Sequence, residues 1–212
     1  MYQNLEHPNI IKFLGSEVMD DTLFIYLEYI PGGSIKYLLN KYGNFSSKLI
    51  KIYLNQMLDG LEYLHSTGVV HRDIKSANIL VDLKGNIKLS DFGVSGQISL
   101  KKNEWESGFL ESLKGTLLWM APEVICQTKY GKKADIWSLG CTLLEMATGL
   151  PPWGKLENQM EAILKIGKSN DNPEIPSYLD EDLIDFLNIC FIRNPKERPS
   201  AKELKEHKFL KS

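Results

Sequence analysis

Two short polar motifs carry the residue types that phosphoryl transfer requires. The run His71-Arg72-Asp73-Ile74-Lys75-Ser76-Ala77-Asn78 places a carboxylate and a carboxamide five residues apart, and Asp91-Phe92-Gly93 begins thirteen residues later. Moving a phosphoryl group needs hard oxygen ligands for Mg²⁺, a base beside the attacking hydroxyl and positive charge near the phosphate. The two motifs together supply this set, although either one alone would fit an ordinary polar turn.

The N-terminal region shows the pattern of strands followed by a short helix. Residues 10–30 are rich in Ile, Leu, Phe, Tyr and Val, and Asp20-Asp21 interrupts them once. This pattern predicts two strands joined by a tight turn. Pro31-Gly32-Gly33 ends the second strand, and Ser34 is placed to cap a short helix that runs to about Lys41.

A long helix and a small hairpin are expected to flank the first polar motif. Apolar residues at three- to four-residue spacing predict a helix that Ser46 or Ser47 caps and that ends at Gly68. The apolar runs 79–81 and 87–89 are separated by a turn composition and predict a hairpin. The first motif would therefore lie in the loop that joins them.

After about Pro122 the pattern is helical nearly to the end of the sequence. Breaker residues occur at Gly149-Leu-Pro-Pro and between 170 and 176. No internal repeat or linker-like composition divides the chain into independent domains. The expected helices cover residues 134–148, 158–167, 180–192 and 201–207.

The composition is typical of a folded protein and indicates no strong overall electrostatic field. Of 212 residues, 43% are hydrophobic and 25% are charged, and the net charge is −2. We therefore expect no nucleic-acid binding. No apolar window is long enough for membrane insertion. Three cysteines without a C-x-x-C pair predict buried free thiols in a reducing compartment, which favours a cytoplasmic protein.

Three more motifs follow in a recognisable order: Ala121-Pro122-Glu123, Asp135-Ile136-Trp137-Ser138-Leu139-Gly140 and Arg198-Pro199. With the first two, they make the sequence resemble a eukaryotic protein kinase catalytic domain, whose motifs include H-R-D-L-x-x-x-N and D-F-G. The resemblance covers essentially the whole chain. It implies an α+β, protein-kinase-like fold with a mostly helical large lobe (31–212) and a remnant of the small-lobe sheet with the hinge (1–30), forming a single partial kinase domain.

The resemblance also implies roles for the residues of the polar motifs. Asp73 would accept or orient the proton of the substrate hydroxyl, and Asn78 and Asp91 would ligate Mg²⁺ bound with ATP. Lys75 would neutralise charge on the transferring phosphate, and a lysine at this position is typical of serine/threonine kinases. Thr116 matches the threonine that bonds to the catalytic aspartate and lysine.

By the same analogy, the second strand and the residues after it form the edge of an adenine pocket. Leu27 would be the gatekeeper, the backbone carbonyl of Glu28 and the amide of Ile30 would pair with adenine, and Leu80 would lie beneath the ring. Without the kinase context, this segment would pass for an ordinary apolar edge strand.

Arginine usage supports the resemblance, because the chain has 22 lysines and only three arginines. Arg198 is placed to pair with Glu123, a structural role, and Asp135 is also assigned a structural role. Arg72 resembles the arginine that receives an activation-segment phosphate. Arg193 is expected at the surface.

The kinase group is suggested by residues 71–82 and 140–153, which look most like the MAP kinase kinase kinases. The p21-activated kinases are the alternative. Ser112 stands where many kinases are phosphorylated in the activation segment. Leu117-Leu118 departs from the Gly-Thr-Pro-aromatic pattern of the group, which affects the expected pocket beside the acceptor residue.

The resemblance begins at Leu5-Glu-His-Pro-Asn-Ile-Ile11, and the sequence contains no Gly-x-Gly-x-x-Gly loop and no strand lysine of the Val-Ala-Ile-Lys type. Three hypotheses follow. The first is a serine/threonine kinase that acts on a protein substrate, a MAP kinase kinase, and is recorded without the start of its small lobe. The second is a pseudokinase or protein-binding module, and the third is a structural helical scaffold.

Overall fold

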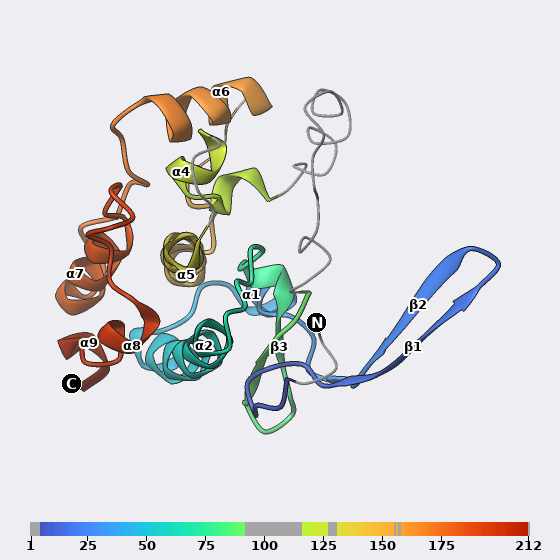
Figure 1. The fold of residues 1–212 in the computed structure, drawn as a ribbon. Helices are drawn as coiled ribbons and strands as arrows, with labels where there is room; N and C mark the ends of the chain where they lie inside the picture. The colour runs from blue at the N-terminus through green and yellow to red at the C-terminus, as the bar shows by residue number, and fades with distance from the viewer. Residues whose placement is uncertain (1–4, 92–115, 127–130, 155, 157, 212) are drawn as a thin grey trace.

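Two long helices form the centre of the fold, α2 (Ser47–Ser66) and α5 (Lys132–Thr148), which pack against each other. The computed structural model describes residues 5–91, 116–126, 131–154, 156 and 158–211. Ser46 caps α2 by accepting a hydrogen bond from the Leu49 N–H. Residues Ala134 to Ala147 of α5 are all buried, as expected for a helix surrounded by protein. Figure 1 views both helices nearly end-on.

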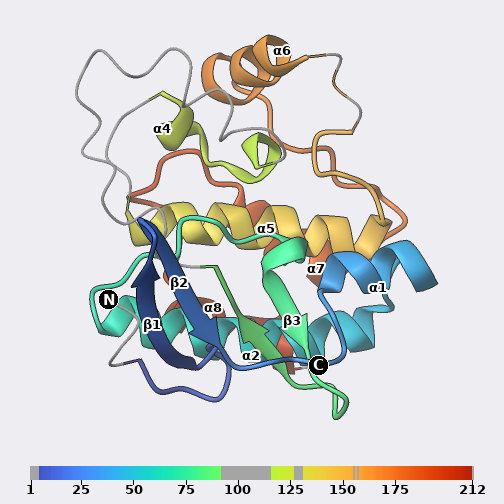
Figure 2. The same ribbon diagram turned by 90° about the vertical axis from the view of Figure 1, so that its right-hand side faces the viewer.

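Shorter helices cover this pair on two sides. Figure 2 shows α4 and α6 on the side of α5 that faces away from α2, and α7 packs against α5 while α8 and α9 contact α2. The π-helical turn η4 (Leu164–Lys168) continues α6. The remaining bounds are α4 Pro122–Ile125, α6 Gln159–Ile163, α7 Glu181–Cys190, α8 Ala201–Leu204, α9 Lys208–Lys211 and the 3-10 turns η2 Ser76–Asn78 and η3 Leu117–Trp119.

One predicted helix is wrong in its extent. The sequence pattern predicts continuous helix from 201 to 207, but α8 ends at Leu204 and α9 begins at Lys208. Between them the chain forms a tighter turn, in which the His207 N–H donates to the Leu204 carbonyl. The imidazole of His207 then accepts a hydrogen bond from the Phe209 N–H, so a side chain competes for a backbone donor.

Two antiparallel hairpins complete the α+β fold. β1 (Phe13–Met19) pairs with β2 (Thr22–Leu27), and β3 (Ile79–Val81) pairs with β4 (Ile87–Leu89). Asp20 and Asp21 join the first pair with positive φ angles of 46° and 61°, as a tight hairpin turn demands. Figure 1 shows this hairpin extending away from the helices, whereas β4 packs against α2.

The chain between β2 and α2 leads from the first hairpin into the helical body. Helix α1 (Ile35–Tyr42) begins at Ser34, whose hydroxyl accepts a hydrogen bond from the Tyr37 N–H. Gly43 ends α1 with a φ of 81°. The backbone of Ser34 also bridges to Leu80 on β3, so α1 is fixed beside the second hairpin.

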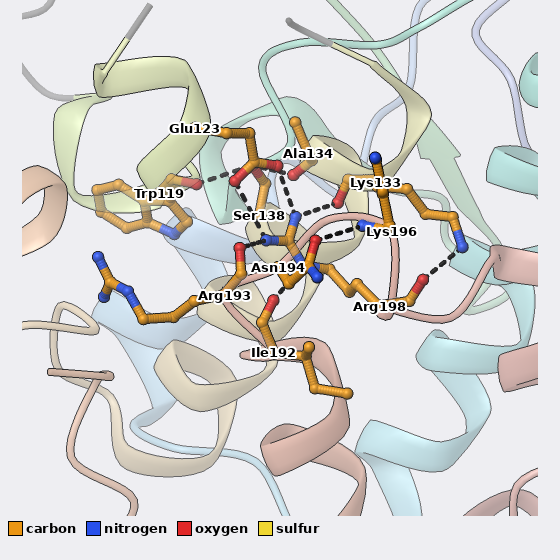
Figure 3. Close-up of polar contacts among 10 residues, drawn as sticks. All are labelled: Trp119, Glu123, Lys133, Ala134, Ser138, Ile192, Arg193, Asn194, Lys196 and Arg198. Atoms are coloured by element: carbon orange, nitrogen blue, oxygen red, sulfur yellow. Dashed lines mark hydrogen bonds and ion pairs between the residues drawn. The ribbon is translucent and has the colours of Figure 1, made fainter. Parts of the chain in front are cut away.

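An ion pair buried in the helical body joins segments that are far apart in the sequence (Figure 3). The guanidinium of Arg198, which is fully buried, donates to both carboxylate oxygens of Glu123 at 2.8 and 3.2 Å. Its Nε donates to the Ile192 carbonyl, and the group lies 5.2 Å from the Trp137 ring. Arg198 therefore ties α4, α5 and the loop after α7 together.

The expectation that Arg193 is a surface residue is wrong. Its side chain is half-buried and lies over the Trp137 ring, 5.9 Å away. The guanidinium donates to the carbonyls of Ile166, at 2.6 Å, and of Asp171. The planar guanidinium thus caps one carbonyl of a π-helical turn and one carbonyl of the loop after it.

The three cysteines are free, but they are not all buried as the sequence pattern suggests. Cys141 and Cys190 lie in the core, where burial raises the pKa of both thiols and keeps them protonated. Cys126 is exposed at the end of α4. Within the described residues, no helix has the length and apolar character needed to cross a membrane.

We predict that Arg198→Ala strongly lowers the stability of the helical body. Truncating one partner of a buried ion pair costs about 3–5 kcal/mol, because the other charge stays buried without compensation. Urea unfolding followed by circular dichroism should show a much lower midpoint than for the wild type. The matched control is Lys196→Ala, an exposed residue of the same loop. Equal midpoints for the two variants would contradict a stabilising role for the pair.

Candidate active site

A single buried carboxylate holds the backbone of the loop that precedes η2. Asp135, which is fully buried in the first turn of α5, accepts hydrogen bonds from the backbone N–H groups of His71 and Arg72, each at 2.9 Å. His65 near the end of α2 contacts the same carboxylate through Nε2 at 2.8 Å. Arg72 itself has a φ of 73°, a conformation that costs energy in a non-glycine residue. The carboxylate stabilises this strained turn.

The imidazole of His71 supports the next residue of the loop. His71 is fully buried, and burial lowers the pKa of its imidazole, which favours the neutral form. Its Nδ1 accepts a hydrogen bond from the Asp73 N–H at 3.3 Å, so the proton of the neutral ring is carried by Nε2. His71 thereby positions the backbone of Asp73.

The side chains of the first polar motif converge on Asp73. The Asn78 amide donates to Oδ2 of Asp73 at 2.7 Å and to its carbonyl at 2.9 Å. Lys75 Nζ lies 2.8 Å from the same carboxylate oxygen and 2.7 Å from the hydroxyl of Thr116. One lysine thus links the loop to η3, which begins directly after Thr116.

The second oxygen of Asp73 has a different environment. Oδ1 is buried and has no hydrogen-bond partner among the described residues. A buried carboxylate oxygen without a donor is costly unless a further group supplies one. One oxygen of the Asp73 carboxylate is therefore fixed by the protein, and the other lacks a donor among the described residues.

Asp91 follows β4 and is connected to the same loop through the backbone. The N–H and the hydroxyl of Ser90 both donate to the Asn78 carbonyl, at 2.9 and 3.0 Å. Asp91 is exposed and has a φ of 58°. Its carboxylate and the side-chain carbonyl of Asn78 are both hard oxygen donors, the type that Mg²⁺ prefers. Phe92, Gly93 and the predicted phosphorylation site Ser112 lie outside the described residues.

The predicted adenine-pocket residues surround the point where the first hairpin joins the helical body. Leu27, Ile30 and Leu80 are half-buried and pack against the hydrophobic core. Leu27 is the last residue of β2, and Leu80 is the middle residue of β3. Apolar side chains from two hairpins thus meet around the segment that leads into α1.

The side chain of Glu28 makes contacts that sequence reasoning missed. Its Oε1 accepts a hydrogen bond from the Lys12 N–H at 2.8 Å and lies 2.7 Å from Nζ of Lys88 on β4. Its own N–H donates to the Lys12 carbonyl. These contacts fix the backbone of the expected hinge on the strand that leads to Asp91. No signal in the sequence links residues 28 and 88, because neither belongs to a recognisable motif.

The site combines the fixed carboxylate of Asp73 with the ammonium group of Lys75. Asn78 and Asp91 add two hard oxygen donors on adjoining segments. These groups suit the deprotonation or orientation of a hydroxyl and the neutralisation of a phosphate. Among the described residues, no three His, Cys, Asp or Glu side chains gather to hold a metal. A magnesium ion needs no such cage, because it usually keeps several waters and binds one or two carboxylates together with substrate phosphates.

Comparison with known proteins agrees with this chemistry. The sequence matches the protein kinase domain family over residues 1–210. It is 49% identical to mitogen-activated protein kinase kinase kinase A of Dictyostelium discoideum over 98% of this chain and 22% of that protein. It is also 49% identical to mitogen-activated protein kinase kinase kinase 3 of Arabidopsis thaliana, over 100% of this chain and 34% of the relative.

The human relative, mitogen-activated protein kinase kinase kinase 3, is 45% identical over 99% of this chain and 33% of that protein. The chain therefore spans about a fifth to a third of the length of these curated relatives. Similarity at this level over nearly every residue, together with the family match, settles the classification of the domain. The chain belongs to the protein kinase family, and within it resembles the serine/threonine kinases of the mitogen-activated protein kinase cascade.

Proposed function

We propose that this protein is a serine/threonine kinase that phosphorylates a MAP kinase kinase in the cytosol. The observation that carries the proposal is the environment of Asp73, with one carboxylate oxygen held by Lys75 and Asn78 and the other without a partner among the described residues. The free thiols support a reducing compartment. The names of the relatives support the choice of substrate.

In this proposal, Asp73 orients the hydroxyl of the acceptor residue and takes its proton. Lys75 offsets negative charge on the transferring phosphate, and its contact with Thr116 holds the ammonium group in place. The pairing of a lysine with a threonine at this point supports serine and threonine as acceptors. Arg72 and Ser112 form the regulatory pair, in which phosphate on Ser112 contacts the Arg72 guanidinium.

ATP is the phosphate donor of protein kinase domains, and Mg²⁺ would neutralise its phosphates when bound. We assign Asn78 and Asp91 to the metal, because both carry hard oxygen donors and stand at the metal-ligand positions of the two motifs. The backbone of Glu28 and Ile30, with Leu27 and Leu80, would hold the adenine. Residues 1–30 would then act as the end of the small lobe and hinge, and residues 31–212 as the large lobe.

The second candidate function is a pseudokinase or protein-binding module built on the kinase-like large lobe. A kinase-like large lobe can bind a protein partner without transferring phosphate. Catalysis of phosphoryl transfer depends on positioning and electrostatics, so an incomplete phosphate cradle leaves little activity. The two functions differ in whether Asp73 is needed.

We predict that Asp73→Asn abolishes phosphorylation of a catalytically inactive MAP kinase kinase. A positioned general base contributes about 10²- to 10⁴-fold to the rate, so the loss should be at least about 100-fold. The assay uses the 212 residues preceded by the glycine loop and strand lysine of the Arabidopsis relative, and measures incorporation of labelled phosphate on Ser and Thr.

The matched control for this assay is Asp20→Asn, because asparagine tolerates the positive φ of that turn and the residue is remote from the motifs. It should retain wild-type activity. If the wild-type fusion binds ATP and transfers no phosphate, the kinase proposal fails for this chain and the binding-module function is favoured. Equal activity of the Asp73 variant and the wild type would remove Asp73 from catalysis.

We also predict that Asp91→Asn removes the Mg²⁺-dependent part of ATP binding. The substitution keeps the shape of the side chain but removes the negative charge that attracts the metal. Calorimetry with and without Mg²⁺ should show metal-dependent affinity for the wild type and none for the variant. Asp171→Asn, an exposed carboxylate near η4, is the control and should bind as the wild type does. An unchanged Mg²⁺ dependence in Asp91→Asn would assign the metal to other residues.

A further inference from the structure

A cavity lies away from the active site, between the end of α2, the start of α5 and the start of α8. Its volume is about 370 Å³, within the size range of small-ligand sites. None of the catalytic motifs lines it. The lining residues are Glu62, His65, Ser66, Lys132, Lys133, Ser200, Ala201 and Lys202.

Three lysines from two elements contribute to the cavity. Lys132 and Lys202 are exposed and form no ion pair or hydrogen bond with another described residue. Lys133 is half-buried, and its Nζ donates to the carbonyl of Arg198. Two lysines without a partner among the described residues therefore line the cavity together with Lys133.

The one carboxylate of the lining does not cancel this charge. Glu62 forms an ion pair with Lys205 at 2.9 Å, and Lys205 also contacts Asp59 at 2.6 Å. The negative charge of Glu62 is thus directed toward a partner outside the lining. The local excess of positive charge is notable in a chain whose net charge is −2.

The start of α5 adds to the positive potential. Lys132 and Lys133 occupy the first two positions of this 17-residue helix, and Gly131 before them offers no side-chain cap. Cations are unfavourable at a helix N-terminus, where the backbone N–H groups already carry partial positive charge. Lys132 breaks this preference without a partner among the described residues, and a local rule broken in this way is typical of functional positions.

A buried polar side chain faces the same cavity. His65 is only 8% exposed, and its Nε2 contacts the carboxylate of Asp135. Its Nδ1 makes no hydrogen bond to another described residue. With Nε2 directed at a carboxylate, Nδ1 is the ring nitrogen left to contact a group in the cavity.

We propose that this cavity binds the phosphate group of a phosphorylated serine or threonine on a protein partner. A phosphate monoester carries a charge of about −1.5 to −2, which matches three lysines with one carboxylate beside them. An inositol polyphosphate carries several such charges and would exceed this balance. The aliphatic stems of the lysines and Ala201 provide apolar surface for the carbon atoms next to the phosphate.

The test measures binding of an acetylated, amidated phosphoserine to the nucleotide-free wild-type chain by calorimetry in a phosphate-free buffer. We expect saturable binding, at least tenfold tighter than that of the unphosphorylated serine compound. Lys132→Gln combined with Lys202→Gln should weaken it at least tenfold. The control combines Lys165→Gln with Lys168→Gln, two exposed lysines of η4 that lie outside the cavity and change the net charge equally.

Each outcome decides the proposal. Loss of binding in the cavity variant but not in the control supports it, provided that both variants melt at the wild-type temperature. His65→Gln, which replaces the imidazole and keeps the lysines, should then also weaken binding. Equal weakening in the cavity and control variants indicates an adventitious ion only and overturns the proposal, as does tighter binding of inositol trisphosphate than of phosphoserine. Because no nucleotide is present, the result is independent of whether the chain is an active kinase.

Discussion

The buried carboxylate of Asp135 and its three donors determine where the candidate active site can form. A carboxylate without water is stable only when hydrogen bonds satisfy it, and here two backbone N–H groups and one imidazole do so. In return, the carboxylate stabilises the positive φ of Arg72. Because Asp135 belongs to the most buried helix among the described residues, its bonds fix the loop at His71 and Arg72 to the core.

From this anchor, a continuous series of contacts leads to the reactive groups. His71 is fixed by its backbone and holds the N–H of Asp73, and the Asp73 carboxylate holds Lys75, which reaches Thr116. Every step joins two groups at hydrogen-bond distance, and all but the step from His71 to Asp73 include a charged group. Such preorganisation is what phosphoryl transfer requires, because the reaction gains more from fixed charges in the right place than from any covalent step.

The sequence predicted features that depend on local signals. The strands of both hairpins and the caps at Ser34 and Ser46 follow from turn and capping residues. Contacts between distant residues were largely beyond its reach: the Asp135 bonds span more than 60 residues, and the Glu28–Lys88 pair also spans 60. Motif spacing predicts local turns, but it does not predict which segments far apart in the sequence contact each other. The Glu123–Arg198 pair was anticipated only through family resemblance.

The three arginines show how far composition alone can inform such contacts. Arg198 and Arg193 each cap backbone carbonyls around Trp137, and Arg72 stands in the strained turn above Asp135. Lysine offers one point of charge, whereas the positions of Arg193 and Arg198 need a planar group that reaches several acceptors at fixed angles. In a chain with 22 lysines, an arginine is retained where geometry as well as charge matters. The scarcity of a residue type therefore made its positions informative, and Arg193, outside every motif, makes contacts of the same kind as Arg198.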